Sequence, residues 1–298
     1  MTYNDIVRRL TSVYGQREAR AMTRILIEDT TGLSYTDMLC GAVDSLPPSE
    51  TLRIEEAVKR LERHEPLQYV TGVATFHGHR LMVRPGVLIP RPETEWLVDT
   101  AITICPQAIT TRPQATTTRP QATASQPQAA TPRLLDIGTG SGCVAIGIKL
   151  ALPHSYVEAW DISDTALDTA TRNSALLNAD ITLRKRDALT ATCDGETWDI
   201  IVSNPPYVCD SEKSSMESNV LDYEPHTALF VPDEDPLLFY RAIADYARQT
   251  LTDNGRLLLE CNTRLVGDTA EMLCRHGFGH VSKADDCFGL PRFVMASR

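Results

Sequence analysis

Hydrophobic residues recur at helical spacing through the first quarter of the chain, without any strand-like run between them. The apolar positions repeat every three to four residues in three stretches: Ile6, Val7, Leu10 and Val13; Ala21, Ile25 and Leu26; Leu52, Ile54, Ala57, Val58 and Leu61. This spacing is typical of helices that bury one face. Turn-forming residues at 30–32 and 47–48 separate the stretches. The pattern predicts a small all-helical domain over residues 1–73.

The pattern changes at residue 74. Residues 74–83 alternate in the manner of two short strands around Gly78, and Arg-Pro-Gly at 84–86 follows them. We therefore expect a β-hairpin connector over 74–90. His77 and His79 lie in this hairpin, but no Cys, His or Asp cluster accompanies them, so we interpret them as polar hairpin residues and expect no metal site.

Strands and helices alternate from residue 133 onward. The strand candidates are 134–137, 156–160, 181–184, 200–202 and 256–259, with helical stretches near 143–151, 164–178, 236–251 and 264–276. Two further strand candidates, 281–285 and 292–296, have no helix between them. The order predicts an α/β fold over residues 91–298, with a doubly wound, mostly parallel seven-stranded sheet that ends in an antiparallel hairpin.

An insert with a seven-residue repeat interrupts this domain. Pro-Gln-Ala recurs at 106, 113, 120 and 127 within residues 106–131. A heptad period suggests a coiled coil, but each repeat contains a proline and lacks the apolar seam that a coiled coil buries. We interpret the insert as a disordered loop without a function.

Composition and charge restrict the class of protein. With 298 residues and a formal net charge of −10, the chain is long enough for about two domains and is acidic. From residue 136 onward, 14 Lys and Arg face 25 Asp and Glu, which argues against stable nucleic-acid binding. Eight cysteines form no C-x-x-C pair, and neither a signal sequence nor a membrane-spanning apolar stretch is evident. We expect a cytoplasmic protein without membrane association.

A glycine-rich loop follows the first strand of the predicted sheet and precedes a helix. Its residues are Gly138, Thr139, Gly140, Ser141 and Gly142. A loop of this kind lets a ligand approach the backbone and the helix N-terminus. The spacing is G-x-G-x-G, whereas a dinucleotide fingerprint needs glycine at the position of Cys143, and no Walker Gly-Lys-Ser/Thr follows.

Further polar residues close the next predicted strands. Asp161 lies nineteen residues beyond Gly142, where doubly wound folds place a carboxylate against ribose hydroxyls. Asp187, or its neighbour Ala188, is placed to meet an adenine edge, and Asn204 ends the fourth strand. Carboxyl ends of parallel strands share one sheet edge, so these residues and the loop predict one cofactor site. S-adenosylmethionine fits it, because this cofactor has ribose and adenine but no pyrophosphate.

Asn204, Pro205, Pro206 and Tyr207 follow the apolar run at 198–203 and indicate the atom that is modified. The Asn204 side-chain oxygen and the Pro205 carbonyl can accept both hydrogens of a planar NH2 group, which is a poor nucleophile that must be held in place. The two prolines restrict the turn, and Tyr207 can lie against the planar group. The tetrapeptide alone fits a side-chain amide or a nucleobase amino group.

These motifs resemble the class I S-adenosylmethionine-dependent methyltransferases and, more closely, the HemK/PrmC release factor glutamine methyltransferases. The closer likeness rests on five segments: Pro-Leu-Gln-Tyr-Val-Thr-Gly at 66–72, Leu-Ile-Pro-Arg-Pro-Glu-Thr-Glu at 88–95, Val-Ser-Asn-Pro-Pro-Tyr at 202–207, Tyr-Glu-Pro at 223–225 and Leu-Leu-Leu-Glu at 257–260. The resemblance implies methyl transfer to the glutamine N5 in the Gly-Gly-Gln loop of class-one peptide chain release factors, which supports translation termination. It also implies that Asn204, Pro205 and Tyr207 act in catalysis.

Two other readings compete with this one. An adenine-N6 DNA or guanine-N2 RNA methyltransferase would hold the same kind of amino group, but needs a basic docking surface. A non-catalytic, cofactor-sensing adaptor would be expected to have lost the loop glycines or Asn204. Substrate selection is assigned to residues 1–73 and the hairpin. Glu93, Glu95, Tyr223 and Glu224 are candidates for shaping the substrate pocket, although helix capping and packing explain them equally well.

Overall fold

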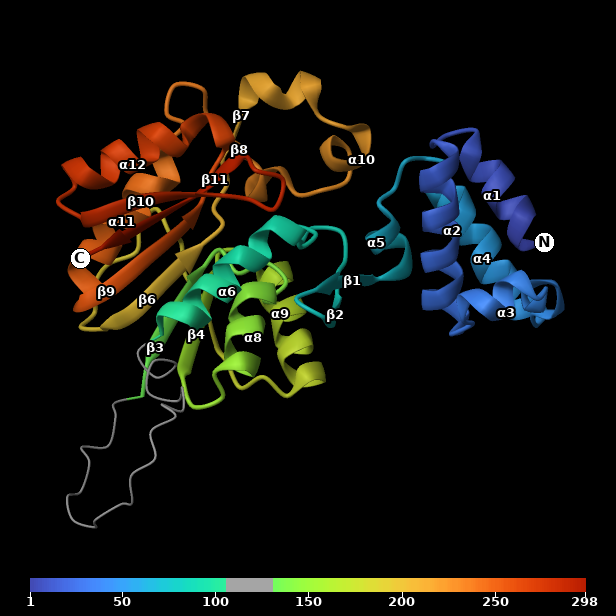
Figure 1. The fold of residues 1–298 in the computed structure, drawn as a ribbon, viewed down its shortest axis with the longest axis horizontal. Coiled ribbons are helices and arrows are strands. Elements are labelled where there is room, and N and C mark those ends of the chain that lie inside the picture. Colours follow the sequence, from blue (N-terminus) through green and yellow to red (C-terminus); the bar gives the residue numbers. More distant parts are fainter. Residues whose placement is uncertain (106–130) are drawn as a thin grey trace, which may run out of the picture.

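The computed structural model describes residues 1–105 and 131–298, and Figure 1 shows its architecture. The predicted repeat insert at 106–131 lies, apart from Thr131, outside the described residues. The N-terminal helices stand to one side of the molecule and the large sheet with its covering helices forms the other side (Figure 1).

Helices form the N-terminal part of the chain. They are α1 (Tyr3–Thr11), α2 (Gln16–Thr31), α3 (Tyr35–Leu39), the 3-10 turn η1 (Ala42–Ser45), α4 (Pro48–Leu61) and α5 (Leu67–Thr71). Leu10, Leu26 and Val58 are fully buried where α1, α2 and α4 meet, so the helices share one apolar core. Thr2 caps α1 by accepting the Asp5 amide. The short pieces α3 and η1 were not predicted individually, because five residues hold too few turns to show a period.

The predicted hairpin is present. It consists of β1 (Val73–Phe76) and β2 (His79–Met82), which pair antiparallel, and both turn residues, His77 and Gly78, adopt left-handed φ values of 48° and 75°. Arg84, just after β2, donates to the Thr169 hydroxyl at 3.0 Å and pairs with Asp168 at 2.8 Å. The connector is thereby fastened to the helix α9 (Asp164–Leu177).

The large sheet has seven strands in the order β10-β11-β9-β6-β3-β4-β5. They are β3 (Arg133–Ile137), β4 (Tyr156–Asp161), β5 (Thr182–Lys185), β6 (Trp198–Ser203), β9 (Leu251–Glu260), β10 (Gly279–Asp285) and β11 (Pro291–Ser297). The five strands from β9 to β5 run parallel, while β11 pairs antiparallel with both β9 and β10. The predicted fold class, including the antiparallel C-terminal hairpin, is confirmed.

Helices cover both faces of this sheet. The 3-10 turn η2 (Pro92–Thr94) leads into α6 (Glu95–Ile104), which shares one core with α8 (Cys143–Ala151), while α9 (Asp164–Leu177) packs against β4 and β5 beside them. On the other face, α11 (Leu238–Thr250) and α12 (Val266–Arg275, preceded by η5, Thr263–Leu265) share a second core with the sheet. Figure 1 shows the two helical layers on opposite sides. The central strands β3, β4 and β6 are buried on both faces, which explains their mostly apolar runs, whereas the edge strand β5 is partly exposed.

Two features of the α/β part differ from the sequence expectation. A two-stranded parallel sheet, β7 (Val208–Cys209) with β8 (Phe230–Val231), frames a segment that contains η3 (Asp210–Ser215), α10 (Ser218–Leu221) and η4 (His226–Ala228). Strands of two residues are too short to leave a pattern. In addition, β9 begins at Leu251 rather than near 256, because the polar residues at 252–254 hide its first half.

Neither a membrane span nor a metal cluster emerges from the described ranges. No helix within residues 1–105 and 131–298 is both long and apolar enough to cross a membrane. The same residues contain no group of three His, Cys, Asp or Glu side chains that could hold a metal ion. The His77 ring contacts Asp99 at 3.0 Å.

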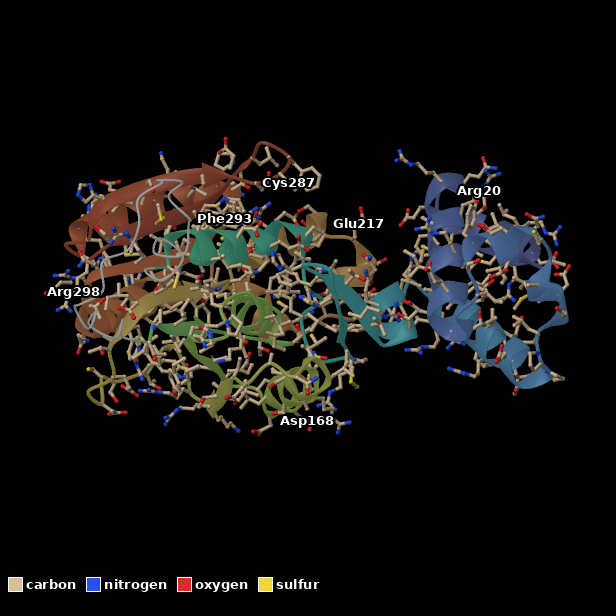
Figure 2. All side chains as sticks on the ribbon, turned by 60° about the horizontal axis from the view of Figure 1, so that its bottom comes forward. Arg20, Asp168, Glu217, Cys287, Phe293 and Arg298 are labelled. Carbon is tan, nitrogen blue, oxygen red and sulfur yellow. The ribbon has the colours of Figure 1, made fainter. Side chains whose placement is uncertain are left out.

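The C-terminal hairpin provides a matched pair of phenylalanines for testing the core. Phe293 is fully buried and stacks on Trp96 of α6 at a centroid distance of 4.3 Å, whereas Phe288, in the turn that also holds Cys287, is 72% exposed (Figure 2). Phe293→Ala should lower the free energy of unfolding by about 3–5 kcal/mol, because it leaves a cavity and removes the stack. Phe288→Ala should change it by less than about 0.5 kcal/mol. Urea unfolding of both variants measures this, and equal effects would contradict the packing described here.

Candidate active site

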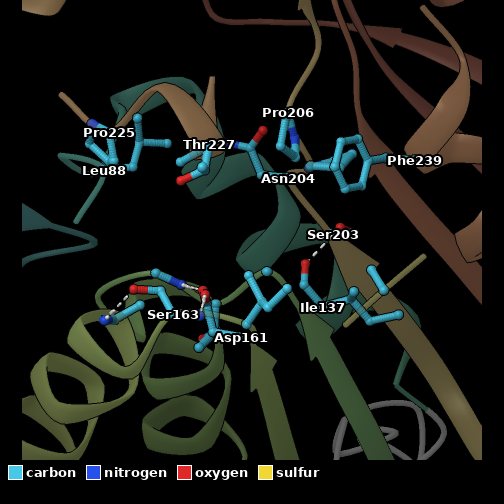
Figure 3. A pocket seen from close by; sticks show the side chains of 18 of the residues that line it. Leu88, Ile137, Asp161, Ser163, Ser203, Asn204, Pro206, Pro225, Thr227 and Phe239 are labelled. Carbon is cyan, nitrogen blue, oxygen red and sulfur yellow. Dashed lines mark hydrogen bonds between the residues drawn. The ribbon is translucent and has the colours of Figure 1, made fainter. Parts of the chain in front are cut away.

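Strand register brings the polar residues of four strands into one row. Ile137 pairs with Trp160 and with Ser203, and Ser203 pairs with Leu259. The next residues on the four strands are Gly138, Asp161, Asn204 and Glu260. A cavity of about 460 Å³ opens at this carboxyl edge. Figure 3 shows Asn204, Pro206 and Phe239 on one side of it and Asp161 with Ser163 on the opposite side.

The glycine loop forms the floor of the cavity. Gly138, Gly140 and Gly142 all have positive φ, at 79°, 57° and 83°, which L side chains rarely adopt. A Cβ on Gly142 would lie 3.0 Å from Ile146 and 3.1 Å from the Ala170 side chain, so α8 and α9 also need glycine there. A Cβ on Gly140 would meet nothing within 4 Å. The loop backbone at Gly140 is therefore open to the cavity.

Asp161 holds this loop in place. Its Oδ2 accepts the Gly140 amide at 2.9 Å and its Oδ1 accepts the Ser163 amide at 2.9 Å. A carboxylate offers about four acceptor positions, so these two bonds leave acceptor capacity for a ligand. Burial raises the pKa of Asp161, and the backbone hydrogen bonds counteract the rise. The predicted position at the end of the second strand is correct, since Asp161 is the last residue of β4.

The predicted adenine contacts also line the cavity. Asp187 and Ala188 lie two and three residues beyond the end of β5 at Lys185, so Asp187 is in the following loop and does not end the strand as expected. The Asp187 Oδ1 accepts the Leu189 amide at 2.9 Å, which fixes the loop. Of the predicted cofactor residues, Gly142 alone is absent from the lining. Gly142 instead allows α8 and α9 to pack closely against the loop.

The charges of the cavity suit S-adenosylmethionine. Both arginines among its described lining residues are paired with carboxylates, Arg91 with Glu224 and Arg186 with Glu196, so neither is free for a phosphate. Three aspartates, at 136, 161 and 187, also line it. Carboxylates favour a cationic sulfonium and accept ribose hydroxyls, whereas a pyrophosphate needs positive groups. The described residues, among them the open backbone at Gly140 and the Asp161 carboxylate, thus fit this cofactor.

The Asn-Pro-Pro-Tyr segment faces the cavity through its first three residues. Asn204, Pro205 and Pro206 line it, and the Asn204 Nδ2 donates to the Thr94 hydroxyl at 3.2 Å. Tyr207 is absent from the lining, which differs from the expected packing against a planar substrate group. Its hydroxyl instead donates to Glu260 at 3.2 Å. Tyr207 thus bonds to Glu260, whereas Asn204, Pro205 and Pro206 face the cavity.

Aromatic residues from other elements line the cavity as well. Phe239 of α11 and Phe230 of β8 do so, and so do residues 86–89 after the hairpin. Sequence reasoning missed the two phenylalanines, because an apolar residue at a helical or strand position looks like ordinary core. It also assigned no role to Thr94 and Glu260, although both lie in segments that carry the family resemblance.

The four candidates for shaping the substrate pocket are absent from the cavity lining. Glu224 is buried and accepts the Ile89 amide at 3.1 Å, in addition to its pair with Arg91. The Tyr223 hydroxyl donates to the Arg63 carbonyl at 2.7 Å, and Glu95 accepts the His77 amide at 2.6 Å. Glu93 is half-buried in η2. Three of the four therefore connect the segments around the cavity.

Two family models match the chain. The PrmC N-terminal domain model matches residues 3–72, and the methyltransferase small domain model matches residues 123–222. A curated release factor glutamine methyltransferase of Bacteroides thetaiotaomicron is 41% identical over 97% of this chain and 96% of its own length. The chain belongs to this family. A second member, from Flavobacterium psychrophilum, is 36% identical over 98% of this chain and 96% of its own length.

Solved structures support the fold alone. The hMettl16 catalytic domain, solved in complex with MAT2A 3′UTR hairpin 6, aligns with a TM-score of 0.54 at 16% identity and covers 84% of this chain and 82% of that one. This family member therefore has the class I methyltransferase fold, and S-adenosylmethionine is its cofactor.

Asp136 gives the site a measurable pH signature. Burial raises its pKa to about 7, against hydrogen bonds from the Thr139 hydroxyl and the Ala145 amide. Since the folded-state pKa exceeds the usual 3.8, the folded state holds this proton longer than the unfolded chain, and stability falls as pH rises from about 4 to about 7. Asp136→Asn removes this component, which is on the order of 4 kcal/mol. The measurement is urea unfolding of both proteins at pH 5, 6, 7 and 8. Parallel stability curves would refute the assignment.

Proposed function

We propose that this protein transfers a methyl group from S-adenosylmethionine to the side-chain amide nitrogen, N5, of the glutamine in the Gly-Gly-Gln loop of class-one peptide chain release factors. The observation that carries the proposal is that Asn204 and Pro205 face the glycine loop across one cavity. The names of the relatives, which match nearly the whole chain, support the choice of a glutamine amide.

The reaction depends on how the chain holds the amide. An amide nitrogen is a poor nucleophile because its lone pair is delocalised, so alignment must supply much of the rate. The Asn204 side-chain oxygen and the Pro205 carbonyl accept its two hydrogens and aim the nitrogen across the cavity. S-adenosylmethionine, when bound, supplies a methyl group on a sulfur that leaves with the electron pair of the broken C–S bond. The methylated nitrogen is acidic and loses its proton to water, so no strong base is needed.

The proposed cofactor contacts are residues that line the cavity. In this proposal the backbone of Gly138, Thr139, Gly140 and Ser141 borders the cofactor, Asp161 accepts the ribose hydroxyls, and Asp187 and Ala188 contact the adenine edge. In this proposal Tyr207 does not cover the substrate amide. It acts on the Asn204 side of the cavity, through its hydrogen bond to Glu260.

Residues 1–73, with the connector at 74–90, are proposed to recognise the release factor, and residues 91–298 to carry the reaction. Recognition is a protein contact in this proposal, since the net charge of −10 disfavours a nucleic-acid surface. The hydrogen bond from the Tyr223 hydroxyl to the Arg63 carbonyl supports this assignment of roles to the two regions, because it joins the segment after Asn204 to the helical part. A nucleobase substrate has no such support.

Replacing Asn204 tests the reaction. Asn204→Ala should abolish methyl transfer and leave cofactor binding within about threefold, because the lost oxygen holds the substrate and not the cofactor. The control is Asn254→Ala, an exposed position at the far end of β9. Labelled S-adenosylmethionine is incubated with a recombinant release factor, with its Gln-to-Ala loop variant, or with duplex DNA. Normal turnover by Asn204→Ala, or label on DNA alone, would overturn the proposal.

A second pair of variants tests the cofactor contact. Asp161→Asn should weaken S-adenosylmethionine binding by about 10- to 100-fold, because charge-assisted bonds to the ribose are each worth about 1.5–3 kcal/mol. Asp164→Asn, three residues away, should leave it unchanged, since Asp164 pairs with Lys185 at the surface. Isothermal titration calorimetry gives both dissociation constants, and equal values for the two variants would remove Asp161 from the cofactor site.

A further inference from the structure

A chain of hydrogen bonds lies behind the Asn204 side chain. The Asn204 Nδ2 donates to the Thr94 Oγ1 at 3.2 Å, and the Thr94 hydroxyl donates to the Glu260 Oε2 at 2.7 Å. The Tyr207 hydroxyl donates to the other carboxylate oxygen, Oε1, at 3.2 Å. Thr94 and Glu260 lie 166 residues apart in sequence and are both buried. Three separate segments therefore meet behind the substrate-holding asparagine.

The direction of these bonds is fixed by chemistry. An ionised carboxylate only accepts hydrogen bonds, so the Thr94 hydroxyl must donate its single hydrogen to Glu260. The Thr94 oxygen then faces Asn204 with a lone pair, and it can only accept. The Asn204 amide must therefore present its NH2 group to Thr94. Its side-chain oxygen, which has no hydrogen-bond partner within the described residues, is left for a ligand.

Both carboxylate oxygens of Glu260 accept a hydrogen bond, Oε2 from Thr94 and Oε1 from Tyr207, as an ionised carboxylate does. Burial raises the pKa of Glu260, and the bond from Thr94, the positive charge of Arg292 and the bond from Tyr207 oppose that rise. Were Glu260 neutral, its carboxyl O–H could donate a hydrogen bond to the Thr94 oxygen, and the Thr94 hydroxyl could then donate to the Asn204 oxygen. The Asn204 side-chain amide would then flip. Its NH2 group would face the substrate NH2 group, which needs a hydrogen-bond acceptor.

We propose that Thr94, Glu260 and Tyr207 are positioning residues that fix the orientation of the Asn204 amide, so that its oxygen faces the substrate NH2 group. This inference rests on the proposed function and adds to it the residues that set the polarity of its central side chain. Burying a carboxylate is costly unless it is well bonded, and a directional role accounts for placing one behind Asn204.

Isosteric substitutions test the polarity. Thr94→Val keeps the shape but removes the hydroxyl, and Glu260→Gln places an NH2 group where only acceptors stood. Each should lower kcat for release factor methylation by about 10- to 100-fold, because the amide is no longer held in one orientation. The dissociation constant of S-adenosylmethionine should stay within about threefold, since the cofactor contacts lie across the cavity. Thr94→Ser retains the hydroxyl and should keep kcat within about threefold of wild type.

Two controls separate positioning from loss of structure. Thr250 is also fully buried and its hydroxyl donates within α11, to the Tyr246 carbonyl at 2.9 Å, so Thr250→Val measures the effect of losing a buried hydroxyl elsewhere. It should leave kcat unchanged. The double variant Thr94→Val/Glu260→Gln should lose no more kcat than the worse single variant, because both act through one side chain.

The outcomes distinguish this inference from the proposed function. Wild-type protein that fails to methylate the glutamine would overturn the function itself. If the wild type is active, the positioning role is overturned by normal kcat in Thr94→Val and Glu260→Gln, by an equal loss in Thr94→Ser, by an equal loss in Thr250→Val, or by additive losses in the double variant. The expected pattern, with loss in kcat only and rescue by serine, would establish it.

Discussion

Parallel strand pairing is the constraint on which the rest of this molecule depends. The pairing sets Ile137, Trp160, Ser203 and Leu259 side by side, so each strand contributes its next residue to one row at the carboxyl edge. These residues are a loop glycine, a carboxylate, an amide and a second carboxylate; the first three line the cavity, and Glu260 bonds to Thr94 and Tyr207. A shift of one strand by one residue would point its side chains to the other face of the sheet and break the row. The apolar runs before these positions hold the register, because both faces of the strands are buried.

The carboxyl ends of these strands also bury carboxylates where folding alone would disfavour them. Burial raises the pKa of Asp136, Asp161 and Glu260, so each costs stability in its charged form. Each is bonded by hydroxyl or amide donors that come from a neighbouring loop or turn. The donors restrain the loops as much as they satisfy the charges: Asp161 fixes Gly140, and Glu260 fixes Thr94. The buried carboxylates destabilise the fold, but their hydrogen bonds orient the acceptors of the cavity before a ligand binds. Amide methylation requires such orientation.

Sequence reasoning recovered what local pattern encodes and missed what only the tertiary fold brings together. The glycine spacing, the strand-end position of Asp161 and the turn at Asn204 depend on neighbouring residues, and the alternation of strand and helix patterns predicted the doubly wound sheet. The link from Thr94 to Glu260 could not be derived in this way, since 166 residues separate its ends. The direction of Tyr207 escaped for a related reason: the partner of its hydroxyl lies on β9, which is adjacent only in the folded sheet. The short strands β7 and β8 left no period to detect.

The connections around the cavity join the region proposed for recognition to the region proposed for reaction. Glu224 bonds the backbone and the arginine of the segment at 89–91, and Thr94 follows four residues after Pro90 in the same segment. Next to Glu224, Tyr223 bonds the helical part at Arg63. Polar contacts thus run from the helical part at Arg63 to Asn204: the bond between Tyr223 and Arg63 is exposed, whereas the bond from Ile89 to Glu224 is buried.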